Sequence, residues 1–155
     1  MSTAWPVAEL DPIRHLHVMA AAVRGARVTE RVLDAPMVDV WTVLTDFEGG
    51  FAAVQPDMRR VRAVWQEGER VSVRAVSRRG FRALLHGSVR PGWCWLQSRF
   101  LVIAMAATSE PDGRTRVALT GGVRIPGRAA IVPAGVRREA RRSLDRLETM
   151  LDERP

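Results

Sequence analysis

A change in hydrophobic period part-way along the chain constrains its fold more than any other feature. From residue 60, apolar and polar residues alternate, which is typical of β-strands with one buried face. Gly, Pro and Asp residues between these segments are typical of turns. We expect strands at 60–66, 70–77, 81–89, 93–107 and 115–123. Because the connections between them are short, the strands are predicted to form an antiparallel meander.

Segments with helical periodicity flank this β-rich region. A strand is expected at 26–33, and Pro36 then suits the first turn of an amphipathic helix. A short second helix or turn is expected at 51–54, before a proline. A long C-terminal helix is predicted from apolar residues three or four apart, which are Val136, Ala140, Leu144, Leu147 and Leu151. Strands and helices in this order predict an α+β domain.

Length and composition exclude several classes of protein. A chain of 155 residues suits one domain with a core of its own. The single cysteine, Cys94, excludes an internal disulfide and a cysteine-based zinc site. The longest purely apolar run, Phe100–Ala107, is too short to span a bilayer, and no signal peptide is visible. We therefore expect a cytoplasmic protein.

The positive charge of the chain is concentrated in its β-rich region. The formal net charge is +7, and all 24 basic residues are arginines, which is typical of a GC-rich bacterial coding sequence. Ten of these arginines, against three acidic residues, lie between Asp57 and Arg99. Arg62, Arg74 and Arg82 alternate with apolar neighbours, which predicts a sheet with one apolar and one basic face.

Residues 32–48 (VLDAPMVDVWTVLTDFE) resemble the strand-to-helix connection of the START-like, or SRPBCC, superfamily of polyketide cyclases/dehydrases and lipid-transport proteins. Pro56 after the next helix and residues 111–119 (PDGRTRVAL) also fit, and the likeness covers about residues 27–153. The resemblance implies a helix-grip α+β fold. In that fold a curved antiparallel sheet wraps around the long C-terminal helix, and two short helices follow the first strand.

The N-terminal residues lie outside this likeness. Asp11-Pro12 combines a helix N-cap with a first-turn proline, and Gly25 is a plausible helix end. We therefore predict two parts, an N-terminal helical leader at 1–25 and a START-like helix-grip domain at 26–155.

The resemblance implies that a hydrophobic small molecule, polyketide-, lipid- or aromatic-like, binds in a central cavity between the sheet and the C-terminal helix. Some family members are cyclases, dehydratases or hydrolases, but no catalytic motif runs through the family. Catalytic residues, and enzymatic activity itself, therefore stay unassigned. Because no Gly-rich phosphate loop, nucleophile elbow or cluster of metal ligands occurs in the sequence, we expect no cofactor and no metal.

Five residues are candidates for ligand binding. On the strand expected at 93–107, Trp95, Gln97 and Arg99 share one face. If that face points inward, Gln97 and Arg99 would orient a carbonyl or carboxylate group of the ligand; otherwise the face of Leu96 and Phe100 forms the core. Trp65 either lines the cavity or fills the core. His86 is a candidate general base, although its alternation with Ala83 and Leu85 favours the outer face.

Three functions are compatible with these observations. The first is binding of a hydrophobic metabolite without chemistry. The second is a polyketide-type aromatase/cyclase or dehydratase, with an acidic carrier protein docking on Arg137, Arg138, Arg141 and Arg142 through complementary charge. The third is contact of the basic sheet face with nucleic acid or an anionic membrane. No sequence-specific nucleic-acid motif is present, so specific nucleic-acid binding is not expected.

Overall fold

A computed structural model describes residues 11–123 and 132–155, with side chains described for 11–122 and 138–155. Its strands form one antiparallel sheet in the order β1-β7-β6-β5-β4-β3-β2. The strands are β1 (Arg27–Leu33), β2 (Met58–Glu67), β3 (Arg70–Ser77), β4 (Arg82–Arg90), β5 (Trp93–Gln97), β6 (Leu101–Ser109) and β7 (Thr115–Val123). The helices are α1 (Pro12–Ala21), α2 (Met37–Thr45), the π-helical turn η1 (Phe47–Phe51), α3 (Ala52–Val54) and α4 (Val132–Asp152).

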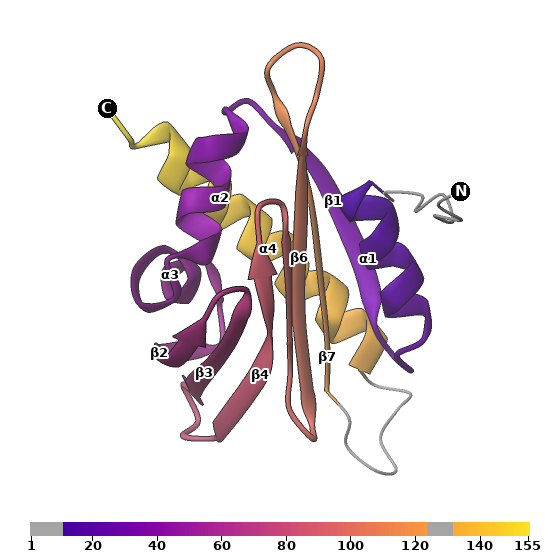
Figure 1. The fold of residues 1–155 in the computed structure, drawn as a ribbon, viewed down its shortest axis with the longest axis vertical. Coiled ribbons are helices and arrows are strands. Elements are labelled where there is room, and N and C mark those ends of the chain that lie inside the picture. The colour runs from indigo at the N-terminus through magenta and orange to yellow at the C-terminus, as the bar shows by residue number, and fades with distance from the viewer. Residues whose placement is uncertain (1–10, 124–131) are drawn as a thin grey trace, which may run out of the picture.

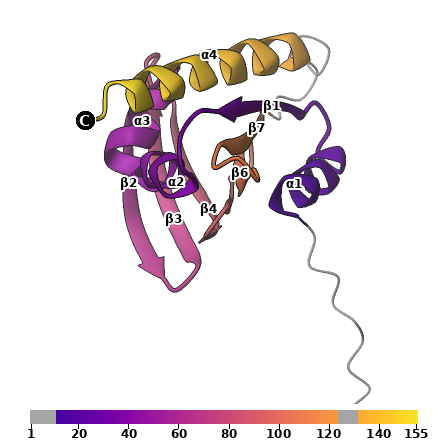
Figure 2. The ribbon, with the colours of Figure 1, turned by 90° about the horizontal axis from the view of Figure 1, so that it is seen from above.

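The predicted α+β helix-grip arrangement is confirmed. After β1 the chain passes through α2, η1 and α3, builds the sheet from β2 to β7, and returns along it as α4 (Figure 1). The last strand, β7, pairs with β1, so the two ends of the β-region meet beside α4. Helices α1 and α4 lie on opposite faces of the sheet (Figure 2). We call the face toward α4 the inner face and the face toward α1 the outer face.

The single strand predicted at 93–107 is wrong, because a tight turn divides it into β5 and β6. The amide of Ser98 donates to the carbonyl oxygen of Leu101 at 2.7 Å. The Ser98 hydroxyl oxygen accepts from the amides of Phe100 and Leu101 at 3.3 and 3.1 Å. A serine hydroxyl thus satisfies the turn amides, so the chain reverses without the Gly or Pro that would have revealed the turn in the sequence.

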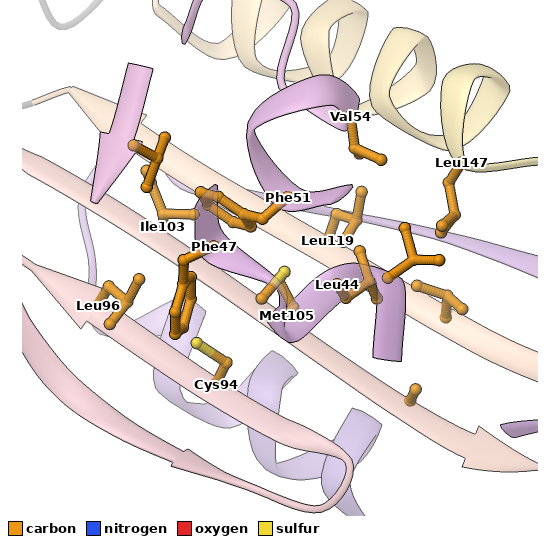
Figure 3. Close-up of a cluster of buried hydrophobic side chains, with 14 of the residues drawn as sticks. Leu44, Phe47, Phe51, Val54, Cys94, Leu96, Ile103, Met105, Leu119 and Leu147 are labelled. Atoms are coloured by element: carbon orange, nitrogen blue, oxygen red, sulfur yellow. The ribbon is translucent and has the colours of Figure 1, made fainter. Parts of the chain in front are cut away.

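The core lies between the inner face of the sheet and the helices α2, α3 and α4. Figure 3 shows side chains from all these elements pointing toward one another: Leu44, Phe47, Phe51, Val54, Cys94, Leu96, Ile103, Met105, Leu119 and Leu147. The predicted buried face of α4 is confirmed at Ala140, Leu144 and Leu147. On β1, Arg31 donates to the carboxylates of Asp145 and Glu148 at 2.8 and 3.3 Å, which helps to hold α4 across the sheet.

The outer face is covered in part by α1, whose start at Asp11 is confirmed. The Asp11 carboxylate caps the helix by accepting from the amides of Ile13 and Arg14 at 2.8 and 3.3 Å. A second buried cluster joins α1 to β5, β6 and β7, through Ile13, Leu16, Trp93, Trp95, Val102, Ala104, Ala106 and Ala118. The His15 ring stacks on Trp93 with centroids 4.1 Å apart. Among the helices in the described ranges, none combines the length and hydropathy that crossing a membrane requires.

Candidate functional site

The space between the sheet and α4 is nearly filled by side chains. Phe47 and Phe51 meet edge to face with centroids 5.5 Å apart, and Phe51 is completely buried. Beside Met58 and Met105, the described residues leave a cavity of about 90 Å³. Sites for drug-sized ligands typically have volumes of about 300–1,000 Å³. The expected central cavity is therefore far smaller in this structure than a polyketide or lipid requires.

One carboxylate lies at the rim of this small cavity. Partial burial raises the pKa of Glu139 above its ordinary value, and the nearby carboxylate of Asp57 raises it further, while Arg142 lowers it. Cys94, on the same inner face, is buried among apolar side chains, and this burial raises the pKa of its thiol to about 12. A thiol with so high a pKa stays protonated near neutral pH and cannot act as a nucleophile.

A much larger groove, of about 620 Å³, opens on the outer face beside α1. We call it the aromatic groove, and its lining includes Met19, Trp65, Arg70, Ser72, His86, Trp95 and Gln97. It therefore contains four of the five residues that the sequence proposed for ligand binding. Two tryptophans supply its aromatic surface, and polar side chains from β3, β4 and β5 converge beside them, so it offers both stacking and hydrogen bonding to a small molecule.

The groove follows from the register of four neighbouring strands. Trp65 pairs with Ser72, Ser72 with His86, and His86 with Gln97, so these residues form one row across β2, β3, β4 and β5. A β-bulge between Ala63 and Trp65 brings Trp65 to the outer face, although strict alternation would place it beside Ala63 on the inner face.

Gly87, next to this row, allows β4 to approach β5 closely. A Cβ atom at Gly87 would collide with the carbonyl oxygen of Trp95, so a larger residue at this position would force the strands apart. On the same two strands, His86 pairs with Gln97, one position from Gly87.

Two hydrogen bonds organise the polar part of the groove. The Ser72 hydroxyl and the Nδ1 atom of His86 are 2.7 Å apart, which leaves Nε2 as the ring nitrogen without a partner among the described residues. The indole Nε1–H of Trp95 donates to Oε1 of Gln97 at 3.0 Å, so the amide nitrogen of Gln97 can still donate to a ligand. Trp95 is 8% exposed and Trp65 is 47% exposed. One tryptophan thus forms a fixed wall, and the other presents an open ring surface.

Comparison with known proteins supports the architecture. A START superfamily protein from Mycobacterium smegmatis matches with a TM-score of 0.65 and 11% identity, over 83% of this chain and 97% of that one. The Zhui aromatase/cyclase from Streptomyces sp. R1128 matches with a TM-score of 0.65 and 18% identity, over 83% of this chain and 95% of that one. The chain has the START-like helix-grip fold. No family model and no curated protein matches the sequence.

A third solved structure, the protein TTHA0849 from Thermus thermophilus, matches with a TM-score of 0.60 and 21% identity, over 83% of this chain and 94% of that one. Identities this low establish the fold, while the function of each protein depends on its own site.

The structure shows which face of β5 points inward. Cys94 and Leu96 belong to the core under α4, whereas Trp95 and Gln97 belong to the outer face. The inward orientation considered for Trp95, Gln97 and Arg99 is therefore wrong. Arg99 lies in the turn between β5 and β6, with its guanidinium 5.6 Å from the centre of the Phe100 ring, and does not line the groove. His86 occupies the outer face that its alternation favoured.

Sequence reasoning missed several residues that line the groove, among them Ser72, Met19 and Arg70. Ser72 alternates with the core residues Val71 and Val73, and that signal could have placed it on the same face as His86. Met19 and Arg70 reach the groove from α1 and from the start of β3, and no local pattern indicates this.

Of the arginines predicted to dock a carrier protein, Arg138, Arg141 and Arg142 are exposed on α4, and the side chain of Arg137 lies outside the described residues.

Proposed function

We propose that the protein binds an aromatic or similarly apolar small molecule in the aromatic groove, as a carrier or sequestering protein. The observation that carries this proposal is the row of Trp65, Ser72, His86 and Gln97 beside Trp95, in a groove of about 620 Å³. The alternative site, under α4, offers only about 90 Å³.

The lining suggests how such a ligand is held. A planar ring stacks on the open face of Trp65 and packs against Trp95, which the α1 cluster holds in place. The Gln97 amide N–H and the His86 Nε2 atom then orient a carbonyl or hydroxyl group on the ring. Because both polar side chains already have one partner, little conformational entropy is lost when they engage a ligand.

Fluorescence titration with N-phenyl-1-naphthylamine, an uncharged planar aromatic compound, tests the proposal. We expect saturable binding that weakens about threefold to tenfold in Trp65→Ala, because one aromatic stacking contact is lost. Phe100→Ala is the matched control, since Phe100 is an exposed ring outside the groove. Absence of binding, or equal binding by both variants, would contradict the proposal.

The Ser72–His86 pair favours a second candidate, proton transfer as in a cyclase or dehydratase. When Nδ1–H of His86 donates to the Ser72 oxygen, Nε2 carries the lone pair and can remove a proton from the carbon next to a ligand carbonyl. The electron pair left on carbon then passes to the carbonyl oxygen, toward which the Gln97 amide can donate.

Hydrogen–deuterium exchange at the α-carbon of a short β-ketoacyl thioester, followed by NMR, separates the two candidates. The second candidate predicts catalysed exchange that falls about a hundredfold or more in His86→Gln. A carrier leaves the exchange rate at its value in buffer while still binding the uncharged aromatic compound.

A further inference from the structure

A second concave region follows the aromatic groove on the outer face. It has a volume of about 570 Å³ and crosses β2, β3 and β4. We call it the arginine groove, and its lining consists of Arg60, Arg62, Arg74, Val76, Arg82, Ala83 and Leu84. Four cationic side chains thus surround an apolar floor, of which Leu84 is 43% exposed.

The charge in the arginine groove is largely uncompensated. Arg62 lies 3.9 Å from the Glu48 carboxylate, in an exposed pair that contributes little. Among the residues that the structure describes, Arg60, Arg74 and Arg82 have no carboxylate within ion-pair distance. Four guanidinium groups around one concave surface repel one another, and an anion placed among them relieves that repulsion. Guanidinium groups also match the planar geometry of carboxylates and the oxygens of phosphates and sulfonates.

The arginine groove lies next to the aromatic groove along the same strands. On β3, Arg74 is two residues from Ser72, and on β4, Leu84 is two residues from His86. Two residues of a strand span about 6.5 Å, and their side chains point to the same face. A ring stacked on Trp65 therefore lies on the same face of the sheet as Arg74, about two residues away along the strands.

We propose that the two grooves together bind an amphipathic aromatic anion, with its ring in the aromatic groove and a carboxylate, sulfonate or phosphate in the arginine groove. This inference rests on the proposed function and specifies the ligand class. The anion carries the charge complementary to Arg74 and Arg82, and the apolar floor at Leu84 accommodates the part of the molecule next to the charged group.

Two dyes that differ by one sulfonate group test the inference on the full chain. N-phenyl-1-naphthylamine is uncharged, and 8-anilinonaphthalene-1-sulfonate carries the same ring system with an anionic group. At low ionic strength, we expect the sulfonate to bind roughly tenfold more tightly, because two or three partly exposed ionic contacts each add a modest amount. The advantage should shrink at about 0.5 M salt, where such contacts are strongly screened.

The variant Arg74→Gln/Arg82→Gln should remove this advantage and leave binding of the uncharged dye unchanged. The control, Arg138→Gln/Arg141→Gln, changes the net charge equally at exposed positions on α4 and should keep the advantage. Thermal melting of the wild type and of each variant checks that all the proteins are folded.

The possible outcomes distinguish failure of the anion inference from failure of the proposed groove binding. Equal affinity of the wild type for both dyes, or equal losses in the two arginine variants, overturns the anion inference while groove binding stands. Failure of both dyes to bind overturns the proposed function and the inference with it.

Discussion

Phe51→Ala is the substitution that most directly tests whether the space under α4 is filled by a packed core. Phe51 is completely buried, packs in the cluster beneath α4 and meets Phe47 edge to face. Truncation of a buried phenylalanine to alanine costs about 3–5 kcal/mol. The edge-to-face pair with Phe47 contributes about 0.5–1.5 kcal/mol of interaction, which places this site near the upper end of that range.

Urea denaturation followed by far-UV circular dichroism measures the loss, with the free energy of unfolding extrapolated to water. For a chain of this length, about 4 kcal/mol corresponds to a fall in Tm of roughly 8–16 °C. Phe81→Ala is the control, since Phe81 is 74% exposed and its truncation should change stability by less than about 0.5 kcal/mol. A loss below about 2 kcal/mol in Phe51→Ala would refute the packed core, because it would mean that the side chain lies in adaptable space.

Three further predictions follow from local contacts. Gly87→Val should lower the free energy of unfolding by about 1–3 kcal/mol, because its side chain collides with the Trp95 carbonyl; a melting temperature equal to wild type would contradict this. The Cys94 thiol, with a pKa of about 12, should not react with an aromatic disulfide reagent at pH 8 until urea unfolds the protein. Hydrogen bonds from the amide and guanidinium of Arg114 lower the pKa of Asp112 from its ordinary value. The stability that this carboxylate contributes is therefore present above its unfolded pKa and is lost as the pH falls through its lower pKa in the folded protein. The stability difference between wild type and Asp112→Asn should therefore shrink when urea titrations are repeated at decreasing pH below about 4.

The elements that the sequence predicted best are those with one apolar face. Leu144 and Leu147 are buried on α4 as their spacing indicates, and Asp11 caps α1 as expected. The strand-to-helix segment at 32–48 was sufficient to suggest the START-like fold.

The orientation of β5 could not be predicted, because both of its faces are buried. Trp93 and Trp95 pack under α1, while Cys94 and Leu96 pack under the other helices, so the strand shows no alternation in hydrophobicity. Sequence reasoning assigned the core to one face only, since the packing of α1 on the sheet depends on contacts between distant residues. For the same reason, the sequence did not indicate that Trp93 and Trp95 lie on the outer face.

Two local irregularities of the strands, a bulge and a turn, made the candidate site impossible to locate from the alternation of residue types. The bulge between Ala63 and Trp65 reverses the side to which Trp65 points, and a bulge leaves no mark on the alternation of residue types. The turn at Ser98 shortens β5 and moves Arg99 away from Gln97. The residue types of Trp65, His86, Trp95 and Gln97 therefore indicated candidates for ligand binding. Their meeting in one groove depends on the pairing register of four strands, which the sequence does not reveal.

The central claim, that an apolar ligand occupies the outer groove and not the space under α4, is tested most directly by NMR of the tryptophan indole N–H groups. Spectra of the ¹⁵N-labelled protein are recorded during titration with N-phenyl-1-naphthylamine, with single Trp→Phe variants used for assignment. We predict that the signals of Trp65 and Trp95 shift, while that of Trp41, which packs against the core under α4, does not. A shift of the Trp41 signal with those of Trp65 and Trp95 unchanged would contradict the claim and place the ligand in the interior.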